Sequence, residues 1–425
     1  MIMNKKLIII GAGPAGLACA LGAIRGGLSP EDMLIIERED ELGGVLNQCV
    51  HDGFGEICLG KNLTGTEYAE YFASKINGLN IPCMTGTTVL SISREKQITV
   101  ISQALGYTTV SADAIVIATG CRERSRGSLK IAGTRPAGVF SAGTVQHFVN
   151  IEGYLTGKRA IVLGSGDIGL VVARRLKIEG AEVVGVYEER AYPRGMDKNI
   201  EQCLKKLDIP FYTQKTVSKI LGKERVEGVI ICDTDKSRKL IKGTEKLVKC
   251  DTIVLSLGLV PDNIICADAG VLIDSATQGA VVDQYYQTNI DGIFACGNAL
   301  HIHDIVDYIT KEGYEAGKCA CAYLNGEISS LGNAVNISHN DGIKHTVPHQ
   351  ISHPILSCTD EIVISYRVSR PMKNVRISLR IDGQEAQFEA KSELTPSRQS
   401  IMVLNKNTLS MLKEARTVSI EATEV

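Results

Sequence analysis

Two glycine-rich segments constrain the fold of this chain more than any other feature of its sequence. They occupy residues 11–16 and 164–169, and each follows an apolar run. Each predicts a strand, a tight turn and the start of a helix. The first glycine makes the turn, the second lets a pyrophosphate approach the backbone, and the third lets helix and strand pack closely. The residues that we expect to contact a dinucleotide are Gly11, Gly13, Pro14, Ala15 and Gly16 in the first segment and Gly164, Gly166, Asp167, Ile168 and Gly169 in the second.

An acidic residue follows each glycine segment at a similar distance. Glu37, with Arg38 next to it, lies 26 residues after Gly11, and Glu188 lies 24 residues after Gly164. A carboxylate about 20 residues after the first glycine, at the end of the second strand, binds a ribose 2′-hydroxyl. Glu188 would repel a 2′-phosphate, which favours NAD over NADP, although arginines at 190 and 194 argue the other way. A chain with two such sites is expected to pass a hydride between a nicotinamide and a flavin.

Three further motifs distinguish the first site from the second. They are Gly43-Gly44, Ala118-Thr119-Gly120 and Gly297-Asn298, and Gly258 ends a later strand-to-glycine repeat. Together with residues 11–16, they resemble the FAD half of the flavoproteins with two dinucleotide-binding domains, the superfamily of the pyridine nucleotide–disulfide reductases. The resemblance implies FAD at the first site and NAD(H) at the second. An aspartate usually stands where this chain has Asn298, which can still hydrogen-bond a ribityl hydroxyl but carries no charge.

The composition is that of a large α/β enzyme. The 425 residues are enough for two to three domains, and the net charge of −2 gives no indication of nucleic acid or an anionic membrane as partner. Thirteen scattered cysteines, an odd number, indicate a reduced, cytoplasmic protein, with peripheral membrane attachment only through a partner. No uninterrupted apolar run reaches the roughly 18 residues of a transmembrane helix.

The order of the predicted elements indicates two interleaved Rossmann-like domains and a β-rich tail. We expect residues 1–121 and 249–330 to form the FAD-binding domain and residues 122–248 the NAD(P)-binding domain. Apolar residues alternate with polar ones at 362–368, 375–381 and 418–422, so residues 331–425 are expected to form a small, mostly β domain. Its expected role is docking or homo-oligomerisation, with simple structural capping as the alternative.

Four segments extend the resemblance to a narrower family. Residues 46–55, 118–124, 164–169 and 296–298 resemble the NAD(P)/FAD-dependent oxidoreductases found beside a flavin-dependent glycerol-3-phosphate dehydrogenase and a small cysteine-rich protein. These are relatives of the FAD subunits of opine, sarcosine and dye-linked proline dehydrogenases. The resemblance implies an electron-transfer subunit that works with a partner dehydrogenase.

Cys49 and His51 are the first candidates for catalytic residues. Disulfide reductases of the superfamily carry a Cys-x4-Cys pair after Gly-Gly, but here only Cys49 follows, with the next cysteine nine residues later. Cys49 is predicted either to act alone as a redox thiolate or to be a buried packing residue. His51 is either a group near the flavin or a surface loop residue. The alternative functions are a self-contained NADH oxidase or peroxide or disulfide reductase that uses Cys49, and a non-catalytic flavin-binding subunit.

His301 and His303 are the second pair of catalytic candidates. They precede a predicted helix that runs through Gly317, with Asp304 as its N-cap and Asp307 at N3. Either histidine is suited to relay a proton to the flavin near pH 7. A metal site made of His301, His303 and Asp304 would lack outer ligands, so we expect no metal.

Overall fold

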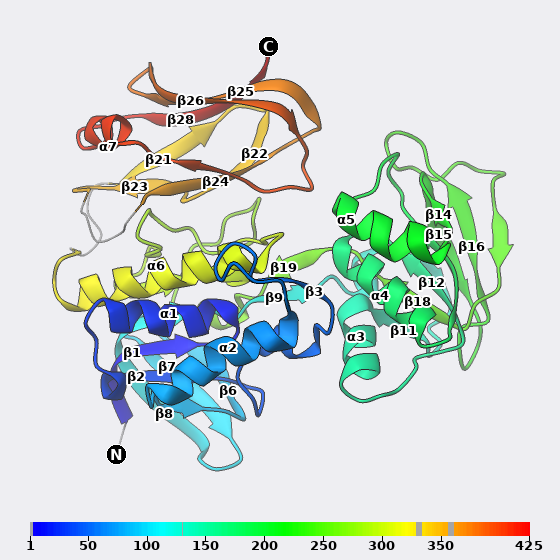
Figure 1. Ribbon diagram of the computed structural model, residues 1–425, viewed down its shortest axis with the longest axis horizontal. Helices are drawn as coiled ribbons and strands as arrows, with labels where there is room; N and C mark the ends of the chain where they lie inside the picture. The colour runs from blue at the N-terminus through cyan, green and yellow to red at the C-terminus, as the bar shows by residue number, and fades with distance from the viewer. Residues whose placement is uncertain (1–2, 130, 329–333, 356–360) are drawn as a thin grey trace. The chain divides into compact units, whose positions relative to one another are not determined.

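The computed structural model describes residues 3–425 except 130, 329–333 and 356–360 (Figure 1). The chain forms two compact units. The first contains Met1–Asn47, Asp52–Cys121 and Pro261–Val425, and the second contains Gln48–His51 and Arg122–Val260. The mixed α/β architecture with Rossmann-like parallel sheets confirms the predicted fold class.

The first unit is built on a sheet with the N-terminal strand at its centre. In spatial order this sheet contains β5 (Cys83–Met84), β2 (Met33–Ile36), β1 (Met3–Ile10), β8 (Gly106–Ile117), β7 (Gln97–Ser102) and β6 (Thr87–Ile92), and β20 (Ile293–Ala295) also pairs with β8. β1 is parallel to both neighbours, with Leu7 opposite Met33 and Ala114. Because parallel strands are covered on both faces, the second half of β1 is a continuous apolar run, and Leu7 to Ile10 are buried. Short β3 (Asp52–Phe54) pairs with β4 (Leu63–Thr64).

Three helices of the first unit accompany this sheet. They are α1 (Pro14–Arg25), α2 (Gly65–Gly78) and α6 (Val306–Leu324). α1 and α6 lie side by side (Figure 1), because glycines leave room where their backbones meet. A Cβ added at Gly317 would lie 1.9 Å from the carbonyl oxygen of Cys19, and one added at Gly22 would lie 2.0 Å from that of Tyr314. This close contact ties the segment after the first glycine turn to the helix after Gly297-Asn298.

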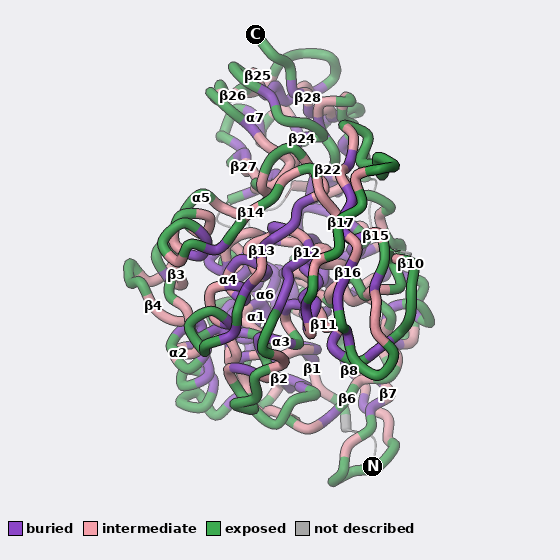
Figure 2. Tube along the Cα trace, turned by 90° about the vertical axis from the view of Figure 1, so that its right-hand side faces the viewer, coloured by how far each residue is buried: buried purple, intermediate pink, exposed green. Residues whose placement is uncertain are grey.

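The second unit repeats the strand–turn–helix arrangement. Its parallel sheet contains, in order, β11 (Val139–Ser141), β18 (Thr252–Leu255), β12 (Arg159–Leu163), β13 (Glu182–Tyr187) and β14 (Phe211–Tyr212). A second sheet contains β10 (Ala132–Gly133), β15 (Lys215–Leu221), β16 (Gly228–Asp233) and β17 (Lys246–Val248), and β9 (Cys121–Glu123) pairs with β19 (Leu259–Pro261). The helices are α3 (Ala142–Asn150), α4 (Asp167–Ile178) and α5 (Asp197–Asn199). Most residues of β12 and β13 are buried, as the colouring of these two strands in Figure 2 shows.

The chain returns to the first unit later than expected. β18 pairs in parallel with both β11 and β12, so it belongs to the sheet of the second unit. The chain therefore re-enters the first unit at Pro261, and not at residue 249 as the sequence predicted. The strand-to-glycine repeat at residues 252–258 resembled the earlier one because both end a parallel strand beside a glycine turn.

The C-terminal segment forms its own apolar core within the first unit. Its sheets contain β23 (Gln350–Ser352), β21 (Ala334–His339), β28 (Val418–Glu424), β25 (Met372–Ile381) and β26 (Gln384–Leu394), and β22 (Ile343–Val347), β24 (Val363–Val368) and β27 (Ser400–Val403), with α7 (Lys406–Leu412) before β28. The inward residues of the three alternating segments are buried together. Arg367 of β24 reaches the Asp304 carboxylate at 2.6 Å, which connects this core to the segment before α6.

In the described part of the chain, no helix is long and apolar enough to cross a membrane.

Candidate functional site

The first glycine segment has the geometry of a phosphate-binding turn. Gly11 has φ +103°, a conformation that side chains rarely adopt, and a Cβ there would lie 2.4 Å from the Ala118 carbonyl oxygen. A Cβ at Gly16 would lie 1.8 Å from the carbonyl oxygen of Gly11, so the turn requires glycine at both positions. A Cβ at Gly13, by contrast, would point into open space. The middle glycine thus leaves its backbone open to a ligand.

The other motifs of the first site meet around this turn. The backbone N–H of Gly43 donates to the carbonyl oxygen of Ala12 at 2.9 Å, and a Cβ at Gly44 would lie 2.9 Å from the Gly13 Cα. A Cβ at Gly297 would lie 2.6 Å from the Cβ of Ala15. With Ala118 against Gly11, motifs separated by almost 290 residues come together at the start of α1.

Glu37 fastens the end of β2 to the glycine turn. It is buried, and its Oε2 accepts the backbone N–H of Ala12 at 2.7 Å while its Oε1 accepts that of Glu39 at 2.9 Å. The two hydrogen bonds hold the carboxylate at the position from which a ribose hydroxyl is bound in this kind of fold. Arg38, in contrast, is exposed and contacts Glu39 at 3.1 Å.

The second segment repeats this geometry with Glu188. This carboxylate is buried, its Oε2 accepts the backbone N–H of Ser165 at 3.0 Å, and its Oε1 accepts that of Arg190 at 3.1 Å. Gly164 has φ +96°, as Gly11 has φ +103°. The two segments, which match in sequence, therefore also share the same hydrogen bond between a glycine turn and a buried glutamate.

The second turn also involves Ser256, which sequence reasoning missed. A Cβ at Gly164 would lie 2.1 Å from the Ser256 carbonyl oxygen, and one at Gly169 would lie 2.5 Å from the Ser256 Cβ. Ser256 occupies the place that Ala118 has in the first unit, one residue after the strand. The repeat ending at Gly258, where φ is +94°, was the signal that could have identified it.

The first turns of α1 and α4 are suited to bind an anion. Their N-caps are Gly13 and Gly166, and neither helix has a side-chain cap hydrogen bond. The leading backbone N–H groups and the helix dipole are thus available for phosphate oxygens. Both turns therefore fit the pyrophosphate of a dinucleotide. Ile168 follows in the first turn of α4, and the Asp167 Oδ1 accepts the backbone N–H of Met196 at 2.8 Å, so this side chain anchors residues 196–199.

The remaining first-site residues lie beside the strand ends. Thr119 Oγ1 donates to the Asp262 carbonyl oxygen at 2.7 Å, and the Asp262 backbone N–H donates to Gly120 at 3.0 Å. Asn298 Oδ1 accepts the backbone N–H of His303 at 2.9 Å. The amide that replaces the usual aspartate is therefore oriented by His303, and its contact with a ribityl hydroxyl stays a prediction.

Cys49 and His51 belong to the second unit. Cys49 is buried, and Gln146 Nε2 approaches its Sγ at 3.8 Å. Burial raises the pKa of the Cys49 thiol to about 12, and the Gln146 hydrogen bond offsets this only in part. A thiol with that pKa is protonated near neutral pH, which favours the packing interpretation. His51 is half-buried.

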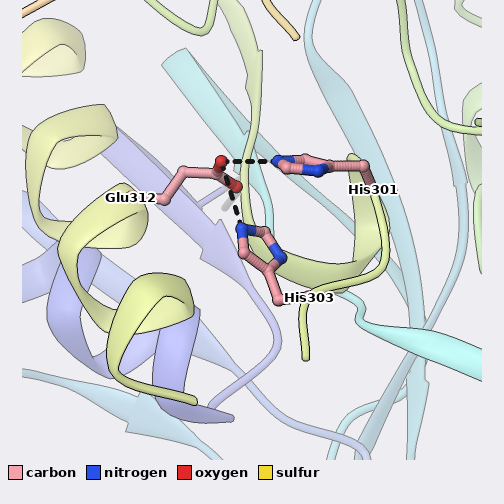
Figure 3. A group of neighbouring side chains, drawn as sticks. All are labelled: His301, His303 and Glu312. Atoms are coloured by element: carbon pink, nitrogen blue, oxygen red, sulfur yellow. Dashed lines mark hydrogen bonds and ion pairs between the residues drawn. The ribbon is translucent and has the colours of Figure 1, made fainter. Parts of the chain in front are cut away.

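His301 and His303 turn toward a carboxylate that sequence reasoning missed, Glu312 of α6 (Figure 3). The Nε2 atoms of His301 and His303 lie 2.9 Å and 3.4 Å from Glu312 Oε2. Burial lowers the pKa of His301 to about 4. Burial alone would raise the pKa of Glu312, but the charges of His303 and His301 and their hydrogen bonds lower it. Glu312 stands at helical spacing from Ile309, Ala316 and Cys319, and an acidic residue in this apolar row was the available signal.

The two aspartates around the start of α6, Asp304 and Asp307, do not have the predicted capping roles. Ile305, not Asp304, is the N-cap residue, and the Asp304 carboxylate instead binds Arg367 and accepts the backbone N–H of Gln399, each at 2.6 Å. Asp307 is buried and accepts the backbone N–H groups of Gly55 at 3.2 Å and Cys58 at 2.7 Å. Partners distant in sequence outcompete the local cap in both cases.

Comparison with known proteins identifies a family match over residues 5–322, described as "Pyridine nucleotide-disulphide oxidoreductase". The chain is 28% identical to the glutamate synthase [NADPH] small chain of Escherichia coli over 346 residues, covering 74% of this chain and 67% of that one. It is 27% identical to the NADH oxidase of Methanocaldococcus jannaschii (72% and 65%) and 27% identical to the thioredoxin reductase of Listeria monocytogenes (76% and 95%). The chain thus spans about two thirds of the first two relatives.

Solved structures share the fold. The thioredoxin reductase of T. acidophilum superposes with a TM-score of 0.61 at 24% identity, covering 77% of this chain and 99% of that one. An NAD-dependent persulfide reductase from A. fulgidus has a TM-score of 0.59 at 19% identity and covers 97% of this chain and 76% of its own. These likenesses establish the architecture of the chain.

Replacing Glu188 tests the second site. We expect Glu188→Gln to weaken NADH binding about tenfold or more, because hydrogen bonds to a charged group contribute about 1.5–3 kcal/mol. Equilibrium titration of NADH measures the change. Glu189→Gln is the matched control, since the Glu189 side chain pairs with Arg238 at the surface, at 3.3 Å. Unchanged affinity in Glu188→Gln, with flavin content retained, would contradict this role.

The pKa of Cys49 predicts slow alkylation. Because that pKa is raised to about 12, the thiolate is scarce at pH 7, and the alkylation rate is expected to rise about tenfold per pH unit up to the pKa. Iodoacetamide labelling of the native protein, followed by peptide mass spectrometry, measures this rate, with urea-unfolded protein as the reference. Labelling of native Cys49 at pH 7 as fast as in the unfolded chain would show that the thiol is activated.

Proposed function

The chain belongs to the pyridine nucleotide-disulphide oxidoreductase family, and from this premise we propose that it passes electrons between NADH and FAD on behalf of a partner dehydrogenase. The family consists of FAD-containing, NAD(P)H-dependent oxidoreductases, and the chain is an enzyme of that class. The proposal concerns the choice of NADH, the assignment of each cofactor to a site, and the partner.

The matched carboxylate geometry of the two glycine turns carries this proposal. The first turn, with Glu37 and the motifs at 43–44, 118–120 and 297–298, would hold FAD, and the second, with Glu188, would hold NAD. When both are bound, they supply hydride transfer between nicotinamide and flavin. The residues of the chain orient the two nucleotides: backbone N–H groups of α1 and α4 bind the phosphates, and the carboxylates bind the ribose hydroxyls.

Glu188 favours NADH over NADPH. Both of its oxygens are held by backbone N–H groups, so the carboxylate stays beside the ribose. A 2′-phosphate would meet this buried negative charge. The Arg190 side chain, which argued for NADP in the sequence, lies 3.4 Å from the hydroxyl of Tyr192.

The thiol chemistry of the chain supports an acceptor outside it. The sequence contains neither a Cys-x2-Cys nor a Cys-x4-Cys pair. The described cysteines form no disulfide, and Cys49 is buried with a raised pKa. Electrons on the flavin therefore need a partner, for which the sequence resemblance suggests a flavin-dependent dehydrogenase of the glycerol-3-phosphate type. The E. coli relative is likewise named as the small chain of a larger enzyme. The reduced state of the described cysteines also supports our proposal of a cytoplasmic location.

Anaerobic titration of the purified flavoprotein, followed by flavin absorbance, tests this function. NADH is expected to bleach the flavin stoichiometrically, and NADPH is expected to do so at least about tenfold less efficiently, because of Glu188. Cys49→Ser is expected to be reduced by NADH within about twofold of the wild-type rate. Absence of bleaching by NADH, with FAD bound, would refute the relay, and loss of bleaching in Cys49→Ser would instead favour a reductase that uses this thiol.

A further inference from the structure

Three side chains around the start of α6 converge on one point. In the described part of the chain, His301, His303 and Glu312 form a group whose ligand atoms all lie within 4.8 Å of one another (Figure 3). Both imidazole Nε2 atoms face the same carboxylate oxygen, Glu312 Oε2, at 2.9 Å and 3.4 Å. The side chains are 2%, 1% and 9% exposed, so the arrangement is shielded from solvent.

The hydrogen bonds of Asn298 determine how His303 presents its ring. The backbone N–H of His303 donates to Asn298 Oδ1 at 2.9 Å, so this atom is the carbonyl oxygen and an acceptor. His303 Nδ1 lies 3.3 Å from the same oxygen. In the tautomer whose Nδ1–H donates to Asn298, the lone pair of a neutral imidazole is on Nε2, 3.4 Å from the Glu312 carboxylate oxygen. These two atoms then present a pair of acceptors that a cation between them can bind.

The surroundings of the cluster match the second shell of a metal site. Metal-binding histidines donate their other ring N–H to a carbonyl or carboxylate oxygen, and His303 Nδ1 lies 3.3 Å from such an acceptor, Asn298 Oδ1. Metal-binding carboxylates are hydrogen-bonded in turn, and Glu312 Oε1 accepts the backbone N–H of Gly297 at 2.6 Å. The ligand oxygen Oε2 is left to the two histidines.

We propose that His301 Nε2, His303 Nε2 and Glu312 Oε2 bind one divalent transition-metal ion, with Zn²⁺ as the best match. Two imidazoles and one carboxylate are an established zinc ligand set, in which water takes the fourth tetrahedral position. With metal–ligand distances of about 2.0–2.1 Å, tetrahedral ligand atoms stand about 3.3 Å apart, and the observed separations of 2.9 Å and 3.4 Å are close to that value.

This site differs from the metal site of His301, His303 and Asp304 that was considered from the sequence. Asp304 is held by Arg367 and Gln399, and Glu312, nine residues after His303, supplies the carboxylate. The ion would tie the segment of residues 297–303, which carries Gly297 and Asn298, to α6. Its existence does not depend on the proposed electron transfer, because it rests on contacts within the first unit alone.

Metal analysis of the full-length flavoprotein, with any affinity tag removed, tests the site. After incubation with Zn²⁺ and exhaustive dialysis, inductively coupled plasma mass spectrometry is expected to find about one zinc per chain. Glu312→Gln and His301→Ala are each expected to lower this at least tenfold, with FAD retained. His339→Ala, an exposed histidine on β21, is the matched control and is expected to keep full zinc content. A zinc content near zero in the wild-type protein would overturn the proposal.

X-ray absorption at the zinc edge keeps the test decisive if the variants fail to fold, because it uses wild-type protein alone. The site predicts nitrogen and oxygen neighbours at about 2.0–2.1 Å with imidazole scattering. The 13 cysteines offer an alternative place for adventitious zinc. A sulfur shell at about 2.3 Å would place the metal on them and would refute the site.

Discussion

A buried glutamate that accepts a backbone N–H from a glycine turn is the interaction on which both proposed nucleotide sites depend. Glu37 does this at Ala12, and Glu188 does it at Ser165. Each hydrogen bond joins the end of the second strand to the turn after the first, so it fixes the distance between the start of the helix and the carboxylate. We propose that the helix start binds the pyrophosphate and the carboxylate binds the ribose of one dinucleotide. Because both units contain this hydrogen bond, we propose one such site in each unit.

Residues distant in sequence complete each site through close packing. Gly297 packs on Ala15, and Gly317 lets α6 approach α1, so the last motif is held by the first helix. Glu312 then connects α6 back to the backbone of Gly297. The packing of α6 against α1 and residues 297–303 thus includes the polar cluster of His301, His303 and Glu312 as well as apolar contacts. Whatever occupies that cluster is coupled to the segment from which Asn298 projects.

Local pattern was sufficient to predict the fold class, the two glycine turns and the alternating C-terminal strands, because spacing and periodicity encode these directly. Assignments that depend on competition between distant partners were not accessible. Asp304 looked like an N-cap, yet Arg367, 63 residues later, binds it. Glu312 looked like an ordinary helix residue, because its inward direction follows from the packing of α6. Residues 249–260 looked like a return to the first unit, but β18 found its partners in the second sheet.

We propose that Glu37 and Glu188 hold two dinucleotides at once, and a crystal structure of the protein with FAD and NAD⁺ is the decisive test. We expect adenosine ribose hydroxyls within hydrogen-bond distance of both carboxylates, FAD at Glu37 and NAD⁺ at Glu188, with each pyrophosphate at the start of α1 or α4. A second nucleotide bound elsewhere, or a Glu188 that makes no ribose contact while NAD⁺ is present, would contradict it.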